Sequence, residues 1–247
     1  MTVTPVPDDV TVCVTSCGRR DLMVETMASL RAFHRIGRLI ISEDSTDAAM
    51  VAWLHKTFPE ATVLHGPKQL GVMGSIDRMY AAVTTPYIFH IEDDWAFDGP
   101  VDFALAKRRL DADPLLSVVC VRVFTDFKAK HRARAASRKV DGIELARMDP
   151  ASHELWYGHS PNPGMLRHDL WHKYKPWSRF TPDGFSGHIK SDGHYMEFVV
   201  PGVAHHIGGG RHVDDPQLPK RPKTRLGKLR REVENGLSKL GLLKKRS

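Results

Sequence analysis

The stretch Tyr87–Asp94, YIFHIEDD, sets three adjacent carboxylates directly after five mostly apolar residues. An apolar run of this length, with aromatic and β-branched members, is typical of a buried strand. Like charges at the edge of a sheet repel one another, and burial disfavours their charged forms unless a cation compensates them. The triplet Glu92, Asp93 and Asp94 therefore indicates either a solvated acidic turn or the site of a hard divalent ion such as Mg²⁺ or Mn²⁺.

The segments around this stretch alternate between strand and helix patterns. Asp21 stands before a helical apolar periodicity and is expected to cap that helix. Short connections between alternating strands and helices predict βαβ units, and so an α/β fold with a mainly parallel sheet flanked by helices. The expected strands cover 10–15, 38–42, 62–65, 87–91, 116–123 and 195–200, and the expected helices cover about 21–33, 48–58, 71–83 and 103–110.

Polar residues follow three of these expected strands. Ser16 comes after the first, the pair Glu43 and Asp44 after the second, and the acidic triplet after the fourth. Ligands of parallel sheets bind at the carboxyl ends of the strands. These side chains are therefore expected to converge on one binding site.

Length and composition limit the class of protein. The chain has 247 residues, 41% of them apolar, which suits one large or two small globular domains and excludes a wholly disordered chain. It contains no apolar run long enough to cross a membrane, and its first residues lack the pattern of a signal peptide. Three cysteines are too few and odd for a disulfide scaffold. The expectation is a cytoplasmic protein.

The net charge of +7 is concentrated at the end of the chain. Residues 220–247 hold 11 Lys or Arg and 2 acidic residues, whereas the remainder is nearly balanced. The body is therefore not expected to bind nucleic acid. The tail instead predicts a basic amphipathic helix, because its apolar residues recur at steps of three and four at Leu226, Leu229, Val233, Leu237, Leu240 and Leu243.

Two interpretations of the tail stay open. A basic amphipathic helix can lie at an anionic membrane surface, which would make the protein peripheral on the cytoplasmic face. It can equally pack its Leu face on the catalytic domain or on a second subunit of a homo-oligomer. Pro219 and Pro222 set it apart, so the expected organisation is a single domain over 1–217 followed by a helical tail over 218–247.

Four motifs carry a resemblance to a known family. The segments 12–19 (VCVTSCGR), 41–45 (ISEDS), 70–75 (LGVMGS) and 89–94 (FHIEDD) resemble the successive nucleotide-sugar motifs of family-2 glycosyltransferases. The resemblance covers about residues 10–96 in order and spacing, with a thinner match around 181–206. It implies the GT-A fold, with a nucleotide-sugar half over about 10–100 and an acceptor half over about 101–217.

The resemblance also implies an activity. Family members transfer a sugar from a nucleoside-diphosphate sugar, here a UDP- or GDP-sugar, with the help of Mn²⁺ or Mg²⁺. The acceptor is a hydroxyl of a glycan or a lipid-linked acceptor, and the expected stereochemistry is inverting. Two alternatives remain. A sugar-phosphate nucleotidyltransferase is disfavoured because 15–20 holds a single Gly, and a non-catalytic nucleotide-sugar-binding protein is disfavoured by the retained carboxylates.

Carried over by position, the motifs suggest roles for individual residues. Thr15 and Ser16 would lie along the nucleoside, Asp44 would accept a hydrogen bond from the base, and Arg78 would face the diphosphate. Asp77 departs from the Asn of many relatives. The whole expected donor-binding set is Thr15, Ser16, Arg19, Glu43, Asp44, Ser75, Arg78 and Asp93.

The expected metal ligands are Glu92, Asp94 and His206. Imidazole can complete a carboxylate site for Mn²⁺. His205 and His206 are adjacent in an expected strand end and must point to opposite faces, so only one can face the metal. The resemblance favours His206, in His-Ile-Gly.

An inverting enzyme also needs a general base to activate the acceptor hydroxyl. Relatives place this carboxylate ahead of the late His. Asp183, 23 positions before His206, is the first candidate, and Asp192 is the alternative. Trp95, directly after the acidic triplet, is the preferred candidate among the aromatic residues for stacking on an acceptor sugar, although large aromatics are more often core residues.

Overall fold

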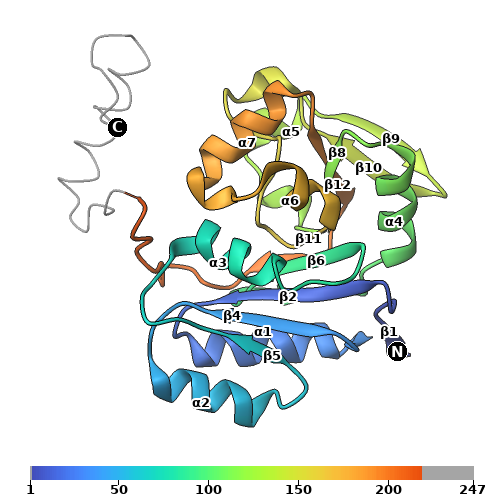
Figure 1. Ribbon diagram of the computed structural model, residues 1–247. Helices are drawn as coiled ribbons and strands as arrows, with labels where there is room; N and C mark the ends of the chain where they lie inside the picture. The colour runs from blue at the N-terminus through green and yellow to red at the C-terminus, as the bar shows by residue number, and fades with distance from the viewer. Residues whose placement is uncertain (1, 219–247) are drawn as a thin grey trace, which may run out of the picture. The chain divides into compact units, whose positions relative to one another are not determined.

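A nine-stranded sheet forms the centre of the computed structural model, which describes residues 2–218 (Figure 1). Four of its strands, β5, β4, β2 and β6, are parallel neighbours in that order. The full order is β5 (Thr62–Leu64), β4 (Leu39–Glu43), β2 (Val10–Ser16), β6 (Tyr87–Glu92), β11 (Gly164–Arg167), β8 (Leu116–Cys120), β12 (Tyr195–Val200), β10 (Ile143–Arg147) and β9 (Ala136–Val140).

The register of the parallel strands brings their carboxyl ends together. Ser16 pairs with Glu43, and Thr15 pairs with Glu92. The strand patterns of 10–15, 38–42 and 87–91 thus become neighbours, as the alternation with helices predicts. The mainly parallel α/β architecture is confirmed.

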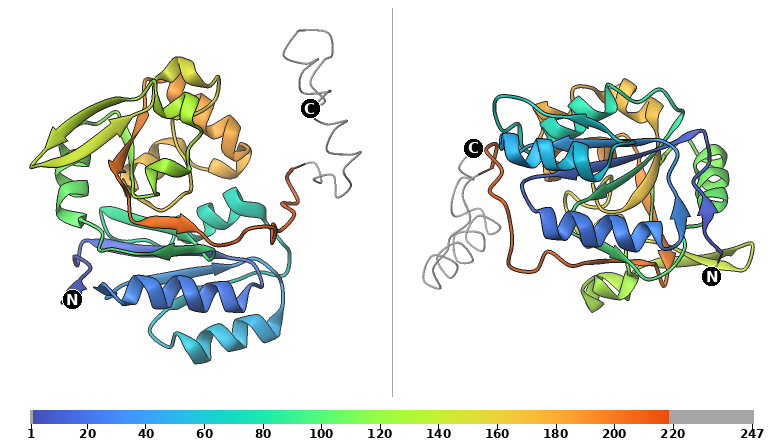
Figure 2. Two further views of the ribbon diagram at one scale, coloured as in Figure 1. Left: turned by 180° about the vertical axis from the view of Figure 1, so that it is seen from behind. Right: turned by 90° about the horizontal axis from the view of Figure 1, so that it is seen from below.

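Helices cover both faces of the parallel strands. The helices are α1 (Arg20–Arg31), α2 (Ala48–Thr57), α3 (Gly71–Tyr80), α4 (Phe103–Ala112), α5 (Ala129–Arg132), α6 (His168–Tyr174) and α7 (Pro182–Ser191), with 3₁₀ turns at η1 (Phe124–Asp126), η2 (Pro150–Ser152) and η3 (Trp177–Arg179). Helices α1 and α2 pack on one face and α3 on the other (Figure 2).

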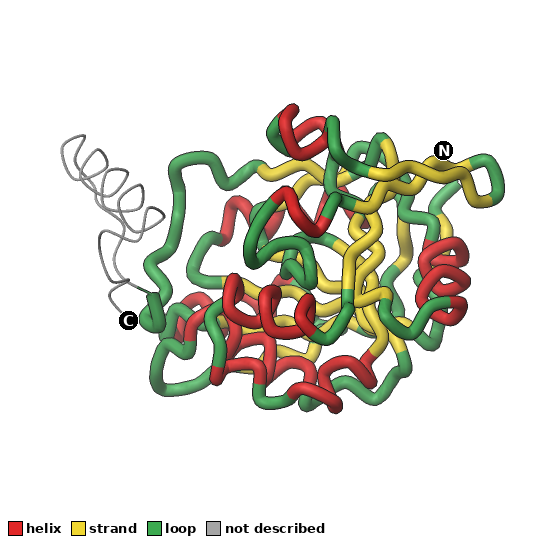
Figure 3. Tube along the Cα trace, turned by 90° about the horizontal axis from the view of Figure 1, so that it is seen from above, coloured by secondary structure: helices red, strands yellow, loops and turns green. Residues whose placement is uncertain are grey.

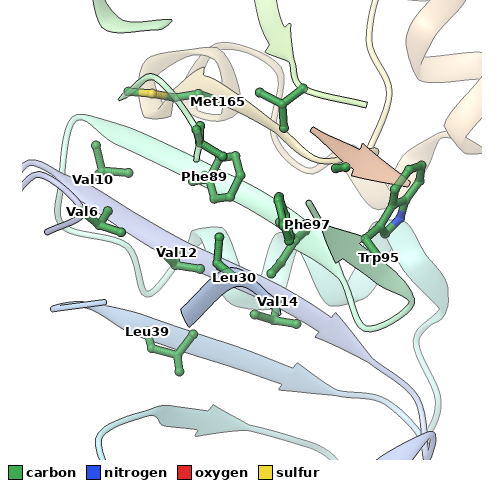
Figure 4. Packing of buried hydrophobic residues seen from close by; sticks show 14 of the residues in the cluster. Val6, Val10, Val12, Val14, Leu30, Leu39, Phe89, Trp95, Phe97 and Met165 are labelled. Atoms are coloured by element: carbon green, nitrogen blue, oxygen red, sulfur yellow. The ribbon is translucent and has the colours of Figure 1, made fainter. Parts of the chain in front are cut away.

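Alternation along the strands explains this division. Val12 and Val14 of β2 point into the core beneath α1, whereas Cys13 between them points toward α3. The strand is buried on both faces, which is why its sequence is a continuous apolar run rather than an alternating one. Figure 4 shows the α1 side of this core, where Phe89 and Leu30 lie close to the two valines.

Two predictions at this level are wrong. Asp21 does not cap α1; the helix begins after Arg19, and the Asp21 side chain instead pairs with Arg211. The basic stretch 128–139 carries six Lys or Arg and no acidic residue, a composition that predicts a mobile loop or an exposed helix. In the structure it contains α5 but ends in the edge strand β9. An Asp141-Gly142 turn with positive φ at both residues pairs β9 with β10 as an antiparallel hairpin, drawn in yellow in Figure 3.

Smaller elements complete the fold. Strand β7 (Trp95–Phe97) follows the acidic triplet and pairs with β13 (Ala204–His206), and β1 (Thr4–Pro5) pairs with β3 (His34–Arg35). The three cysteines are free. Among residues 2–218, no helix is long and apolar enough to span a membrane.

The chain divides into two units, Met1–Val213 and Asp214–Ser247. This division lies four residues before the boundary expected from the sequence. The predicted amphipathic helix falls in the second unit and lies outside the described residues, so it stays a prediction.

Candidate functional site at the carboxyl edge of the sheet

Glu43 holds together the two loops that follow β2 and β4. Its carboxylate accepts hydrogen bonds from the Ser16 hydroxyl at 2.8 Å, from the Gly18 amide at 3.1 Å and from the Ser45 amide at 2.8 Å. The side chain is 1% exposed. Glu43, expected among the donor-binding residues, therefore shapes the loops from within, and Ser16 is bound to it.

Asp44 joins the end of β4 to the start of α3. Its oxygens accept hydrogen bonds from the backbone amides of Leu70 and Gly71 at 2.8–3.0 Å, and burial raises the pKa of its carboxyl. Ser75, one helical turn further, is buried nearby. A carboxylate at a helix N-terminus is stabilised by the partial positive charge there.

Arg78 is bound to the same corner. Its guanidinium donates to the Ser42 hydroxyl at 2.9 and 3.1 Å and to the Glu43 carbonyl at 2.9 Å, and it lies 3.4 Å from Asp44. The Nη1 atom of Arg78 is buried and has no hydrogen-bond partner. The two N–H groups of this nitrogen are therefore left for a ligand in the part of the chain that the structure describes.

Asp93 and Asp94 share one arginine. Arg19 Nη1 donates to Asp94 Oδ2 at 2.6 Å, and Arg19 Nη2 donates to Asp93 Oδ1. The Cys17 amide also donates to Asp93 at 3.3 Å. Burial raises the pKa of the Asp93 carboxyl to about 6, while Arg19 opposes that rise. The carboxylates of the triplet are thus compensated by a cation from the protein itself.

His206 reaches Asp94 from the small sheet. Pairing of His206 with Trp95 in β13 and β7 places its Nε2 atom 3.2 Å from Asp94 Oδ2. Its neighbour His205 pairs with Ala96 and makes no such contact in the described structure. Asp94 Oδ1 is buried and accepts no hydrogen bond from residues 2–218. A free carboxylate oxygen beside an imidazole suits Mn²⁺.

The third predicted metal ligand does not join this pair. Glu92 accepts a hydrogen bond from Trp95 Nε1 at 3.2 Å, and burial together with the charge of Asp94 raises its pKa to about 8. In the part of the chain that the structure describes, no three His, Cys, Asp or Glu side chains are placed to hold a metal together. The set Glu92, Asp94 and His206 is therefore not assembled; Asp94 and His206 fit a metal whose other ligands come from a bound molecule.

The two candidate bases lie at opposite ends of α7. Asp183 is exposed in the first turn, where Thr181 rather than an acid caps the helix. Asp192 follows the last turn and accepts a hydrogen bond from the Tyr174 hydroxyl at 2.7 Å. No contact between either carboxylate and Asp94 is seen among the described residues. The choice between them stays a prediction.

Trp95 is not available for sugar stacking. It is 2% exposed, and its backbone amide donates to the Thr26 hydroxyl of α1 at 3.2 Å. Its ring packs edge-on against His206, with centroids 5.4 Å apart. The prediction of an acceptor-stacking role is wrong, because β7 turns this side chain into the core, where it supports the imidazole instead.

Two side chains, Asp77 and Arg122, make contacts that no pattern in the sequence indicates. Asp77, the departure from the family motif, accepts hydrogen bonds from the Trp177 and Ser178 amides at 2.9 and 2.8 Å and from Trp171 Nε1 at 2.8 Å. It ties α3 to the segment that leads into α7. Arg122, just after β8, lies over the Trp95 ring at 5.4 Å. Only the folded chain brings these partners together.

No protein-family model matches the sequence, and no curated protein matches it. Several solved structures resemble the fold, and two of them are glycosyltransferases. GalNAc-T7 with UDP, GalNAc and Mn²⁺ aligns with a TM-score of 0.54 at 10% identity, over 79% of this chain and 43% of that one. S. aureus TarS 1-349 in complex with UDP aligns with a TM-score of 0.50 at 11% identity, over 79% of this chain and 59% of that one. The chain spans about half the length of these structures. Its fold is that of GT-A-type glycosyltransferases.

Proposed function

We propose that the protein is a metal-assisted glycosyltransferase that moves a sugar from a nucleoside-diphosphate sugar to an acceptor hydroxyl. The observation that carries this proposal is the pairing of Asp94, with its free Oδ1 atom, and His206 at the carboxyl edge of a GT-A-type sheet. The UDP bound in both structural neighbours, and the Mn²⁺ in one of them, favour a UDP-sugar and Mn²⁺ over the GDP-sugar and Mg²⁺ alternatives.

The residues at this edge have different proposed roles in sugar transfer. Ser16 and Asp44 shape the wall against which the nucleoside would lie, and Arg78 offers its free Nη1 atom to an anionic group. Asp94 and His206 would hold the cation. When bound, the cation would neutralise charge on the departing nucleoside diphosphate. Arg19 supplies positive charge at the same place.

The acceptor hydroxyl must lose a proton as it attacks. Asp183 is the proposed base because it is exposed and the chain enters α7 from a segment held to α3 by Asp77. Attack by the acceptor oxygen on the face of the sugar opposite the nucleoside diphosphate, with its proton passing to the base, inverts the anomeric centre. The proposed acceptor is a glycan or a lipid-linked glycan.

The test is a donor panel. UDP-, GDP- and TDP-sugars are incubated with the full chain, Mn²⁺ and simple glycoside acceptors, with and without a chelator. We expect nucleoside-diphosphate release from one donor class, dependent on metal, with inversion seen by NMR of the product. Pyrophosphate release from a nucleoside triphosphate and a sugar 1-phosphate would instead identify a nucleotidyltransferase. Saturable nucleotide binding without any turnover would identify a binding protein.

A further inference from the structure

The acidic cluster, Asp93 and Asp94, is paired with a cation that belongs to the chain itself, Arg19. Arg19 spans both carboxylates of the cluster, with Nη1 on Asp94 and Nη2 on Asp93. The Asp93 side chain is fully buried, and that of Arg19 is 16% exposed. A bidentate guanidinium in a half-buried place interacts far more strongly with carboxylates than a surface lysine does. Without it, two adjacent carboxylates would repel each other in the sheet edge.

Arg19 and a bound metal would compete for one oxygen atom, Asp94 Oδ2. Asp94 Oδ2 accepts from Arg19 Nη1 at 2.6 Å and lies 3.2 Å from His206 Nε2. A divalent ion bound by Asp94 and His206 would come within ligand distance of both, and therefore into the space beside the guanidinium. Two cations so close repel each other where water is largely excluded. The arginine and the metal cannot both be held in these positions.

Arg19 has few contacts besides its ion pairs with Asp93 and Asp94. Apart from the two carboxylates, its guanidinium contacts only the Arg211 carbonyl, at 3.4 Å, among the hydrogen bonds of the described residues. Its Nε atom is buried without a partner. The side chain emerges from the residue before α1, where the helix has no side-chain cap that would fix it. Apart from these two ion pairs, few contacts among the described residues oppose a swing away from Asp94.

We propose that Arg19 is a displaceable internal cation that competes with the divalent metal for Asp94. In the metal-free site the guanidinium then offsets part of the negative charge of Asp93 and Asp94, and metal enters by releasing the guanidinium, which becomes available to an anionic ligand. This inference rests on the proposed function only for the identity of the metal. The competition itself can be measured on the nucleotide-free protein, so loss of the glycosyltransferase proposal would leave it standing.

The experiment is a titration of the nucleotide-free full chain with Mn²⁺, followed by the electron paramagnetic resonance of free Mn²⁺. Arg19→Met removes the guanidinium, and the matched control Arg20→Met removes its exposed neighbour, whose guanidinium lies 5.7 Å from the centre of the Trp53 ring. We expect Arg19→Met to bind Mn²⁺ at least about tenfold more tightly than the wild type, and Arg20→Met to bind it as the wild type does.

A second readout is thermal stability. Arg19→Met leaves Asp93 without its partner and should unfold at a lower temperature than the wild type, and Mn²⁺ should restore more of its stability than it adds to the wild type. Adding Asp94→Asn to Arg19→Met should abolish the gain in affinity. Should Arg19→Met fail to fold, Arg19→Lys, which keeps one charge and loses the fork, is expected to show a smaller gain in the same direction.

Three results would overturn the proposal. Equal or weaker Mn²⁺ binding by the folded Arg19 variant would mean that the arginine does not compete. An equal gain in Arg20→Met would reduce the effect to net charge. A gain that survives Asp94→Asn would place the ion elsewhere.

Discussion

At the scale of single residues, Asp94 contacts both Arg19 and His206. It does so through one oxygen and leaves the other, Oδ1, buried and unpaired. A buried carboxylate oxygen without a partner is costly, so it needs a ligand. This residue therefore links the stability of the empty site to its chemistry.

We expect Asp94→Asn to lower turnover by at least about 10²–10³-fold, because it keeps the shape of the side chain but loses the charge that holds a cation. Metal-supported nucleotide binding should fall with it. The measurement is kcat and Mn²⁺-dependent thermal shift with UDP. Asp98→Asn, an exposed carboxylate just after β7, is the control. An Asp94→Asn enzyme as active as the wild type, or a wild type active in excess chelator, would contradict the role.

The burial of His159 should make the stability of the fold depend on pH in the acid range. Burial lowers the pKa of this imidazole from 6.5 to about 3, so the folded protein keeps it neutral while the unfolded chain protonates it below about pH 6.5. Above that pH the imidazole is neutral in both states and costs the fold nothing. As the pH falls from 6.5 toward 3, protonation of the unfolded chain lowers the free energy of unfolding by up to about 1.4 kcal/mol per pH unit.

The test compares urea unfolding at pH 7 and pH 5. His159→Gln, which does not titrate, should lose less stability between the two pH values than the wild type. His55→Gln, on an exposed face of α2, should lose as much as the wild type. Parallel pH dependence in the wild type and His159→Gln would show that this imidazole is not kept neutral by the fold.

At the scale of elements, the segment after β13 lies directly on the acidic cluster. The Ile207 amide donates to the Asp94 carbonyl at 2.8 Å. A Cβ atom on Gly208 would lie 2.5 Å from Asp94 Oδ2, whereas one on Gly209 would meet nothing within 4 Å. Only glycine at position 208 lets the backbone come this close to the carboxylate.

We therefore expect Gly208→Ala to displace the Asp94 carboxylate, to weaken Mn²⁺-supported nucleotide binding and to cost about 1–3 kcal/mol of stability. Gly209→Ala should change stability by less than about 0.5 kcal/mol and leave binding intact. Isothermal titration of nucleotide with Mn²⁺ and thermal unfolding measure the two effects. Equal stability and equal nucleotide binding of the two variants would mean that the segment after β13 is not in close contact with the Asp94 carboxylate.

Helix α7 offers the other element-scale test, because it carries both candidate bases. We expect Asp183→Asn to keep nucleotide binding and to lower kcat by about 10²–10⁴-fold, the loss typical of a missing general base. Asp192→Asn, whose amide oxygen can still accept the hydrogen bond from the Tyr174 hydroxyl, should be mild. Exchange of the two outcomes would move the base to the other end of α7, and two active variants would argue for a retaining enzyme or another base.

At the scale of the whole molecule, the sequence predicts the parallel half of the sheet because its signals are local. Apolar runs, helical periodicity and the carboxylates after each strand all lie within a few residues of one another. The pairing of Arg19 with Asp94 joins residues 75 apart, and that of Asp77 with Trp177 joins residues 100 apart. No local pattern announces such contacts. The β9–β10 hairpin is different, since its Asp141-Gly142 turn is a local signal in the sequence.

The tail is the largest part of the chain whose role remains a proposal. We propose that 220–247 docks on an anionic membrane, where each Lys or Arg near the surface adds about 1 kcal/mol of attraction that salt screens. Its Leu face would enter the interface, because the spacing of Leu229 and Leu240 would put them on the same side of the predicted helix. This would bring a GT-A-type domain near a lipid-linked acceptor on the cytoplasmic side.

Co-sedimentation with vesicles tests this proposal. The full chain should pellet with vesicles that contain anionic lipid, should pellet less at high salt and should stay in solution with neutral vesicles. A chain that ends at Pro219 should not pellet with either. Replacing Leu229 and Leu240 by Asp keeps most of the basic charge and destroys the apolar face, so it separates insertion from simple attraction. Equal pelleting of the full and shortened chains, or none by either, would leave the tail as a packing or oligomerisation element, which size-exclusion chromatography of the two chains would then reveal.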